Sequence, residues 1–256
     1  MKSEITLETW DSASINQNRV FAAVFAHSDD LAILAGGLTM KLLAEGYTGY
    51  FIKTTNDEMD SYDLSMAETV YRLYNETVEV TNFLGLKKLY SLDYKNHYLE
   101  HGQISEIRHR LITLFRFLQV DTVISFDPWG HYEENPDHYI TGHAVEQACW
   151  TAGRHLDLPE LSDLGLKPKF VTRKYLVARG PQLINRVVDI SPVIDRKFEA
   201  IKIHRTPLDN MLRTHRDLHP NDPIGIDDYI KREFLQEADS RYGVQFVEQF
   251  HYIDEG

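Results

Sequence analysis

Short apolar runs alternate with amphipathic stretches along this chain, and the alternation predicts its secondary structure. The run from Val20 to Ala26 (VFAAVFA) ends abruptly at polar residues, which is typical of a buried strand. Leucines follow at positions 31, 34 and 38, and these spacings of three and four predict a helix that Gly46 closes. The pattern therefore begins as a buried strand followed by an amphipathic helix.

The same reasoning predicts the elements that follow. Strands are expected at Tyr50 to Thr55, Thr122 to Phe126, Phe170 to Ala178 and Arg186 to Ile190, and helices at Met66 to near Gly85, Ile104 to Leu118, Tyr139 to Ala152, Ile194 to His204 and Asp228 to Ala238. Strands that alternate with helices indicate βαβ units, whose right-handed crossovers place helices on both faces of a parallel sheet. We predict an α/β, Rossmann-like fold with a mostly parallel sheet flanked by helices. Residues 20–256 are expected to form a single domain after a polar N-terminal extension, residues 1–19.

Charge narrows the range of partners. Lys and Arg number 27 and Asp and Glu 39, so the formal net charge is −12. A field of this sign repels phosphate backbones and anionic lipids, which argues against nucleic acid or a membrane as partner. No segment reaches the roughly 18 uncharged apolar residues of a membrane span, and the N-terminus lacks an apolar signal core. With a single cysteine, Cys149, which suits a reducing compartment, the sequence predicts a cytoplasmic protein.

Two polar clusters follow predicted strands. His27-Ser28-Asp29-Asp30 comes directly after the first strand, and Asn135-Pro136-Asp137-His138 lies in the loop after the strand Thr122 to Phe126. In open α/β sheets, ligands bind outside the carboxyl ends of the strands. Both clusters are therefore expected at one rim of the sheet, although about 110 residues of sequence separate them.

The side chains of these clusters form a donor set typical of a catalytic metal site. Two histidines, His27 and His138, with one carboxylate, Asp30, are a common ligand set for zinc, which keeps a fourth position open for water and lowers the pKa of that water to about 7. Asp29, beside a ligand, is positioned to accept the proton of the water. His143, on the same predicted helix as His138, is an alternative ligand.

A purely structural interpretation explains some of the same residues. Asp29 and Asp30 could cap the following helix, where carboxylates favour the positive end of the dipole, and Asn135-Pro136-Asp137 is an ordinary turn and helix start. Two other classes of protein are poorly supported. No G-x-G-x-x-G follows the first strand, as a dinucleotide site requires, and the Gly36-Gly37 pair lies inside the predicted helix. No G-x-S-x-G occurs, as serine hydrolases of the α/β class require.

The two clusters also resemble the motifs of a known family. The LmbE-like, or PIG-L, family of zinc-dependent N-acetylglucosaminyl deacetylases has AHPDDE after a strand and HPDH before a helix; this chain has AHSDDL from Ala26 and NPDH from Asn135. Later segments, including VVDISPVIDRKFEAIKIH and VEQF, agree in the same order, so the resemblance spans about residues 20 to 252. It implies an LmbE-like three-layer sandwich that removes an acyl group, usually acetyl, from an amino sugar or its conjugate.

The resemblance implies a role for each matched residue. His27, Asp30 and His138 match the ligands of one Zn²⁺ per chain, although the same donors would hold another divalent transition metal. Asp29 matches the general base, which activates the zinc-bound water and later protonates the departing amine. Arg72 is a looser match to an arginine that contacts substrate. Relatives often form trimers or hexamers, so the resemblance allows a homo-oligomer.

Asn135 is the departure from the family pattern that matters most. The family has a histidine at this position, thought to support the tetrahedral oxyanion. Asparagine carries no positive charge, but its amide donates hydrogen bonds and can serve an oxyanion hole. His131, four residues earlier in the same loop, is an alternative donor. A second functional hypothesis rests on Asn135: a metal-binding member of the family whose catalysis is impaired.

Other residues of the expected rim suggest how a small amino-sugar substrate is held. Trp129 and His131 precede His138 in an acidic loop, and an aromatic ring beside carboxylates suits a sugar with an apolar face and several hydroxyls. After the second strand, the same rim is expected to carry Asn56, Asp57, Glu58 and Asp60, which either bind substrate hydroxyls or amine, as the prediction takes for Asp57, or only cap a helix. Acidic surroundings favour a neutral sugar or a cationic product over a phosphorylated one, whereas a solvated acidic loop is the simpler alternative.

Overall fold

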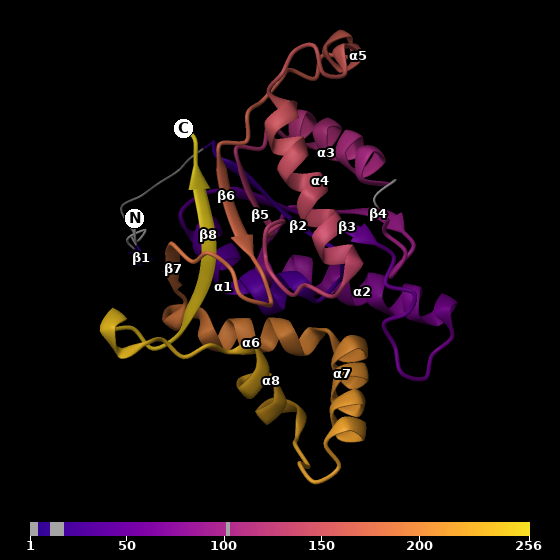
Figure 1. Cartoon of the computed structure of the whole chain (residues 1–256), viewed down its shortest axis with the longest axis vertical. Coiled ribbons are helices and arrows are strands. Elements are labelled where there is room, and N and C mark those ends of the chain that lie inside the picture. Colours follow the sequence, from indigo (N-terminus) through magenta and orange to yellow (C-terminus); the bar gives the residue numbers. More distant parts are fainter. Residues whose placement is uncertain (1–4, 11–17, 101–102) are drawn as a thin grey trace.

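The structure is a computed structural model that describes residues 5–10, 18–100 and 103–256. Within them, one eight-stranded sheet has the order β1-β7-β8-β6-β5-β2-β3-β4 (Figure 1). The strands are β1 (Thr6–Glu8), β2 (Val20–Phe25), β3 (Thr48–Thr55), β4 (Lys88–Tyr94), β5 (Thr122–Phe126), β6 (Arg173–Val177), β7 (Arg186–Asp189) and β8 (Val247–Asp254). Strand β8 is antiparallel to both of its neighbours, and the other pairs are parallel, so the mostly parallel sheet is confirmed.

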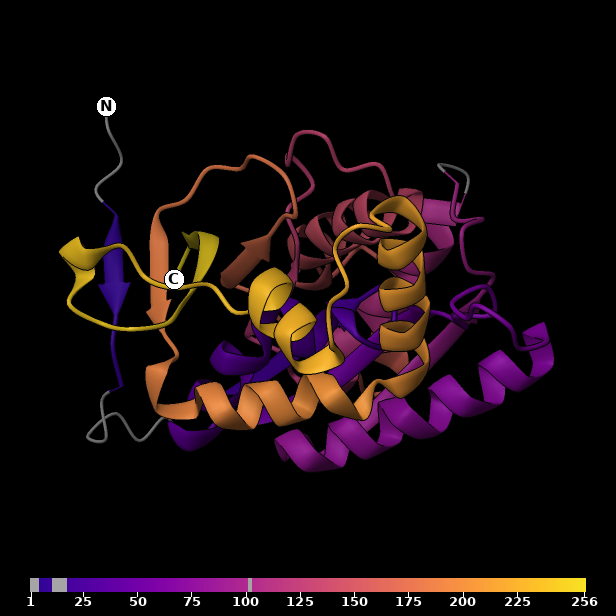
Figure 2. The ribbon, with the colours of Figure 1, turned by 90° about the horizontal axis from the view of Figure 1, so that it is seen from below.

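Helices cover both faces of this sheet, which confirms the three-layer arrangement. They are α1 (Asp30–Ala44), α2 (Met66–Leu84), α3 (Ile104–Leu118), α4 (Pro136–Ala152), α5 (Pro159–Asp163), α6 (Ile194–Ile203), α7 (Arg205–Leu218) and α8 (Ile226–Phe234). Helices α3 and α4 pack on one face, and α1, α2 and α6 on the other (Figure 1). Turned by 90°, the molecule shows α2 and α6 along its lower side, with α7 and α8 above α6 in the view (Figure 2). None of the described helices is long and apolar enough to cross a bilayer.

Strand β2 lies at the centre and is buried on both faces. Phe21 and Phe25 point into the core beneath α1, whereas Ala22 and Val24 point into the core beneath α3 and α4. Successive side chains of a strand alternate between faces, so a strand that packs helices on both sides must be apolar at every position. The continuous run VFAAVF therefore specifies a central strand, and its carboxyl end delivers His27 to the middle of the rim.

The helix after β5 begins earlier than its apolar pattern indicates. The prediction started it at Tyr139, but α4 begins at Pro136, because the Asn135 side chain accepts the backbone N–H of Asp137 at 2.9 Å. Asparagine as the cap and proline as the first helical residue are a favourable pair. This start brings His138 into the first turn of α4, close to the rim.

Part of the predicted N-terminal extension belongs to the sheet. Residues Thr6–Glu8 form β1, which pairs in parallel with β7. The Glu8 carboxylate also accepts hydrogen bonds from Lys41 and Arg186. Three residues are too few to carry a readable pattern, so this edge strand was not predicted; residues 1–4 and 11–17 of the extension lie outside the described residues. Helix α7, directly after α6, was also missed.

Helix α1 is interrupted at Ala35, where the backbone is not helical (φ −147°, ψ 22°). Past the interruption, the N–H groups of Gly37 and Leu38 each donate to the Glu248 carboxylate of β8 at 2.8 Å. Lys197 of α6 donates to the same carboxylate at 2.7 Å, and both charged side chains are buried. Glu248 thus supplies the acceptors that a restarted helix needs for its first N–H groups.

Close packing at this interruption explains one glycine of the Gly36-Gly37 pair. A Cβ on Gly37 would lie 2.3 Å from Cγ2 of Ile190 and 3.1 Å from the Glu248 carboxylate. A Cβ on Gly36 would meet only ordinary contacts, the nearest being Lys197 Cγ at 3.6 Å. Glycine is therefore needed at position 37 for close approach, and not at position 36.

These two glycines give a matched test of the interruption. Gly37→Ala is expected to lower the free energy of unfolding by about 1–3 kcal/mol, the usual effect of overpacking a buried site. Gly36→Ala is expected to leave it unchanged or raise it by up to about 1 kcal/mol, because alanine is the better helix former. Urea unfolding followed by circular dichroism measures both. Equal effects of the two substitutions would contradict the close packing of Gly37 against Ile190 and Glu248.

Candidate active site

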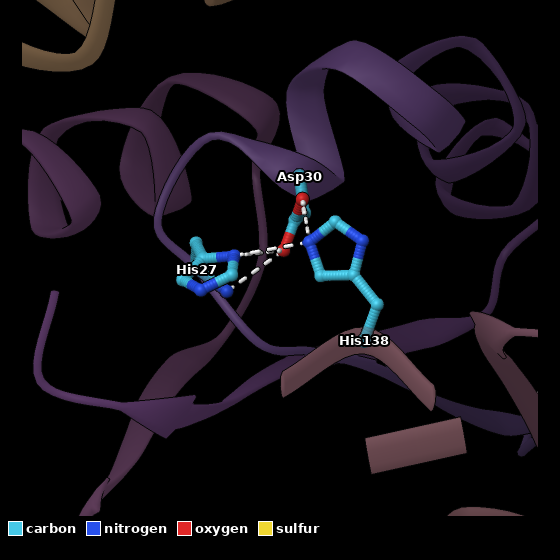
Figure 3. A group of neighbouring side chains, drawn as sticks. All are labelled: His27, Asp30 and His138. Carbon is cyan, nitrogen blue, oxygen red and sulfur yellow. Dashed lines mark hydrogen bonds and ion pairs between the residues drawn. The ribbon is translucent and has the colours of Figure 1, made fainter. Parts of the chain in front are cut away.

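Two adjacent parallel strands bring the two polar clusters together. Strand β2 leads into His27 and into Asp30, the first residue of α1, and β5 leads through its loop to His138 in α4. Strands β2 and β5 pair in parallel, so their carboxyl ends lie at the same rim. Figure 3 shows the three side chains converging on one point from these separate elements.

The three side chains are spaced as ligands of one metal ion would be. His27 Nδ1 lies 3.1 Å from His138 Nε2 and 3.3 Å from Asp30 Oδ2, and His138 Nε2 lies 3.5 Å from Asp30 Oδ1. Ligands at zinc distances in a tetrahedron stand about 3.4 Å apart. All three residues are buried, and this group contains His138 rather than the alternative ligand His143. The donor set and its spacing therefore fit a tetrahedral metal ion.

A buried carboxylate fixes the orientation of His27. Its Nε2 lies 3.1 Å from Asp137 Oδ2, so Nε2 carries the proton and donates it, which leaves Nδ1 facing Asp30 and His138. Asp137 is fully buried and also accepts the backbone N–H groups of His97 and Leu99. Burial alone raises the pKa of Asp137, but its hydrogen bonds outweigh burial and hold the pKa below its usual range.

His138 also has a carboxylate beside it, that of Glu133, at ion-pair distance and without the geometry of a hydrogen bond. Its Nδ1 lies 3.2 Å from Glu133 Oε2, and its ring stacks on Phe126 with centroids 4.2 Å apart. Arg179, which follows β6, forms an ion pair with Glu133. Burial raises the pKa of Glu133, but His138 and Arg179 outweigh it and lower the pKa to about 2. The sequence interpretation treated Asp137 as a turn residue and Glu133 as a rim residue, and it assigned neither of them to a histidine. One signal could have identified them, because a histidine that binds a metal usually has a carboxylate beside its other ring nitrogen.

Two consecutive aspartates differ in their electrostatic surroundings. Burial raises the pKa of Asp30, but the imidazoles of His138 and His27 outweigh burial and lower it to about 2. Burial also raises the pKa of Asp29, and the neighbouring carboxylates of Asp30 and Asp60 raise it further, well above the usual range. Asp30 is thus ionised and suited to bind a cation, whereas the raised pKa of Asp29 means that it binds a proton more readily.

These residues open onto a cleft of about 340 Å³. Its lining comprises His27, Asp29, Asp30, Ile33, Leu34, Asp60, His97, Asn135, His138, Arg179, Met211, Tyr229 and Phe234. Asn135 lines the cleft while its Oδ1 caps α4, so the end of the amide left for a ligand is the Nδ2 donor. Asp60 was expected at this rim, whereas Arg179, Met211 and Tyr229 were missed, because tertiary packing of α7, α8 and the segment after β6 brings them to the rim without a local pattern.

Asp57 requires a correction. Its side chain is fully buried, forms an ion pair with Lys53 and accepts a hydrogen bond from Thr55 Oγ1 at 3.1 Å. The carboxylate therefore pairs with groups at the end of β3 and is not part of the cleft lining. The placement expected for Asp57 is therefore corrected: its carboxylate pairs with a buried lysine of the preceding strand, which the sequence analysis overlooked, and is not part of the cleft lining.

Three other expected substrate contacts also lie outside the cleft lining. Arg72 is exposed on α2, and His131 is exposed in the β5–α4 loop. Trp129 is half-exposed, with its ring 5.9 Å from that of His251. His131 is thus not positioned to replace Asn135 as a donor, and the aromatic face toward the cleft comes from Tyr229 and Phe234 of α8 instead.

Comparison with known proteins is consistent with this geometry. The model of the PIG-L family, described as GlcNAc-PI de-N-acetylase, matches residues 22–149. The diacetylchitobiose deacetylase of Thermococcus kodakarensis is 32% identical over 187 residues, which cover 70% of this chain and 67% of that protein. A probable N-acetyl-alpha-D-glucosaminyl L-malate deacetylase 2 of Bacillus anthracis is 25% identical over 71% of this chain and 78% of its own length.

Similarity extends to solved structures. The N,N'-diacetylchitobiose deacetylase of Pyrococcus horikoshii, complexed with its inhibitor MPG, superposes with a TM-score of 0.77 at 25% identity, over 96% of this chain and 88% of that chain. The family match includes the strands and helices that carry both polar clusters. The chain therefore belongs to the PIG-L family.

Proposed function

We propose that this protein is a metal-dependent hydrolase that removes the acetyl group from an N-acetylated amino sugar or its conjugate. The proposal rests on one arrangement: a buried His27–Asp30–His138 group beside Asp29, in a cleft of sugar size. Its support from relatives is the 32% identity to a diacetylchitobiose deacetylase. The alternative is a family member that binds metal without turnover. It would use the same three ligands, but Asp29 and Asn135 would have no part in catalysis.

His27, Asp30 and His138 would hold the metal, which we propose to be a single zinc ion. When bound, zinc supplies Lewis-acid chemistry, lowering the pKa of a water molecule and polarising the acetyl carbonyl. Asp137 and Glu133 keep the two imidazoles oriented with one nitrogen each toward the ion. Iron and cobalt suit the same donors, so metal content has to be measured rather than assumed.

Asp29 is proposed as the group that moves the proton. Its carboxylate takes a proton from the attacking water as the new C–O bond forms at the acetyl carbon. It then gives that proton to the amide nitrogen as the C–N bond breaks, so that acetate and a free amine leave. The raised pKa of Asp29 suits both steps, since a base must first hold the proton and then release it.

Asn135 is proposed to stabilise the oxyanion of the tetrahedral intermediate through its Nδ2 donor. One such donor typically contributes about 10²–10³-fold to kcat. The carboxylates of Asp29, Asp30 and Asp60 at the same cleft support a neutral sugar as substrate, because they repel phosphate groups and attract the cationic amine product.

Metal content tests the ligand group. Protein purified without added metal is expected to contain about one equivalent of a divalent transition metal, and the His27→Ala, His138→Ala double variant is expected to contain none. His143→Ala, on the same helix, should keep its metal and serves as the matched control. Elemental analysis by mass spectrometry gives the ratio. Absence of metal from the wild type after reconstitution with zinc would overturn the proposed centre.

Asp29→Asn separates an enzyme from a metal-binding protein. The substitution keeps the shape of the side chain and removes the proton acceptor, so kcat on an N-acetylated sugar should fall by about 10²–10⁴-fold. Metal content should stay at the wild-type value, because Asp29 is not a ligand. A release assay for acetate measures the rate. Unchanged turnover would show that another group moves the proton.

Two substitutions at Asn135 separate its contribution to catalysis from its cap. Asn135→Asp keeps an oxygen that can cap α4 but has no amide donor, so thermal stability should hold while kcat falls by about 10²–10³-fold. Asn135→Ala removes both, and should also lower the free energy of unfolding by about 1 kcal/mol. If Asn135→Asp keeps wild-type kcat, the oxyanion donor lies elsewhere.

A further inference from the structure

Arg179 is held at the cleft by the loop that carries Asn135. It lies two residues after the end of β6, and the chain that follows it packs against the β5–α4 loop. The N–H of His131 donates to the Pro181 carbonyl at 3.1 Å, and a Cβ on Gly180 would lie 2.3 Å from the His131 carbonyl oxygen. The path of the chain beside Arg179 is therefore fixed by backbone contacts with this loop.

One carboxylate joins Arg179 to Asn135. Glu133 Oε2 accepts the N–H of Arg179 Nε at 3.2 Å, and Oε1 accepts an N–H of Nη2. The same Oε1 also accepts the backbone N–H of Asn135 at 3.0 Å. Arg179 and Asn135 therefore share one acceptor atom, which places the guanidinium beside the start of α4. Both residues line the metal cleft.

Several donors of the Arg179 guanidinium remain for a ligand. A guanidinium has N–H groups on three nitrogens, and Glu133 receives one from Nε and one from Nη2. The third nitrogen, Nη1, makes no hydrogen bond to the residues that the structure describes. The side chain is half-exposed, so a ligand in the cleft can reach it. Glu133 thus fixes the direction of a fork whose outer N–H groups are still free to donate.

Arg179 also brings a positive charge, which Asn135 lacks. The lining contributed by the described residues contains the carboxylates of three aspartates and the guanidinium of Arg179. Burial lowers the pKa of Arg179, but the carboxylate of Glu133, and after it those of Asp30 and Asp29, outweigh burial and raise the pKa. Arginine therefore keeps its charge here. A charged donor binds an anionic oxygen about twice as strongly as a neutral amide does.

We propose that Arg179 is a catalytic residue whose free N–H groups donate, beside Asn135, to the oxyanion that forms from the acetyl carbonyl. The inference rests on the proposed function for the reaction itself. As the water oxygen bonds to the acetyl carbon, the π electron pair moves to the carbonyl oxygen, and it returns when the C–N bond breaks. Arg179 transfers no proton. It stabilises a charge that the transition state has and the substrate lacks, and Glu133 is its positioning residue.

A second arginine near β6 supplies a matched control. Arg173 also pairs with a carboxylate, that of Asp254 at 3.3 Å, but it does not line the cleft. Arg179→Met and Arg173→Met therefore remove the same charge from a similar ion pair, inside and outside the site. Arg179→Lys keeps the charge and loses the planar fork. Circular dichroism and thermal unfolding establish that each variant is folded.

The kinetic test measures kcat, KM and metal content of the metal-loaded proteins with N-acetylglucosamine as substrate. Arg179→Met should lower kcat by about 10²–10³-fold and leave KM within about threefold, because the lost interaction exists only in the transition state. Arg179→Lys should recover about tenfold of that loss, and Arg173→Met should match wild type. All four proteins should contain the same amount of metal.

Three results would overturn the assignment of Arg179. The kcat of Arg179→Met could stay within about twofold of wild type, which would mean that the guanidinium contributes nothing. KM could rise at unchanged kcat, which would place the contact in the bound substrate rather than in the transition state. Metal content could fall together with kcat, which would mean that Arg179 only supports Glu133 beside His138.

A binding measurement tests Arg179 without turnover. In N-methylphosphonyl glucosamine, a tetrahedral anionic group replaces the acetyl group, so binding requires no proton transfer by Asp29. Calorimetry is expected to give a Kd weaker by about tenfold or more in Arg179→Met than in wild type and Arg173→Met. If wild type hydrolyses no N-acetylated sugar, the proposed function fails, and this measurement still decides the role of Arg179. Equal Kd values for the three proteins, or no binding to wild type, would overturn that role.

Discussion

The Glu248 carboxylate connects the last strand of the sheet to the helix that begins at the site. It accepts two backbone N–H groups of α1 and one N–H of Lys197, so β8, α1 and α6 must all be in place around it. A buried carboxylate without these partners would be several kcal/mol less favourable. The first turn of α1, which begins at Asp30 directly after Asp29, is therefore fixed in part by a contact beyond the helix interruption.

At the rim, aspartates that are close together have different pKa values because their surroundings differ. The imidazoles of His138 and His27 outweigh burial and lower the pKa of Asp30, whereas burial, and after it neighbouring carboxylates, raise the pKa of Asp29 and Asp60. Such divergence between adjacent acids is the usual way in which one site obtains both a ligand and a base. The imidazoles are oriented in turn by Asp137 and Glu133, so five buried or half-buried groups act as one network.

Local sequence patterns were sufficient to predict the central strands and the helices beside them. A strand buried on both faces is a continuous apolar run, and a helix buried on one face has a stripe of apolar residues at helical spacing. They were also sufficient to bring His27 and His138 to one rim, since both follow parallel strands. They failed for Asp57, because a buried pair with Lys53, only four residues earlier, leaves no recognisable pattern. They also failed for Arg179 and Tyr229, which tertiary packing brings to the cleft. Strand β1 is too short to have a period.

Strand β8 occupies an interior position of the sheet, between β6 and β7, although it is the last of the described strands in the order of synthesis. A growing chain therefore possesses His27, Asp30 and His138 more than a hundred residues before it possesses Glu248. During that interval the backbone of α1 lacks its acceptor, and Lys197, once it is made, lacks its counter-charge until β8 follows. The order of synthesis thus separates the time at which the three donor side chains exist from the time at which the contact that fixes the backbone beside them can form.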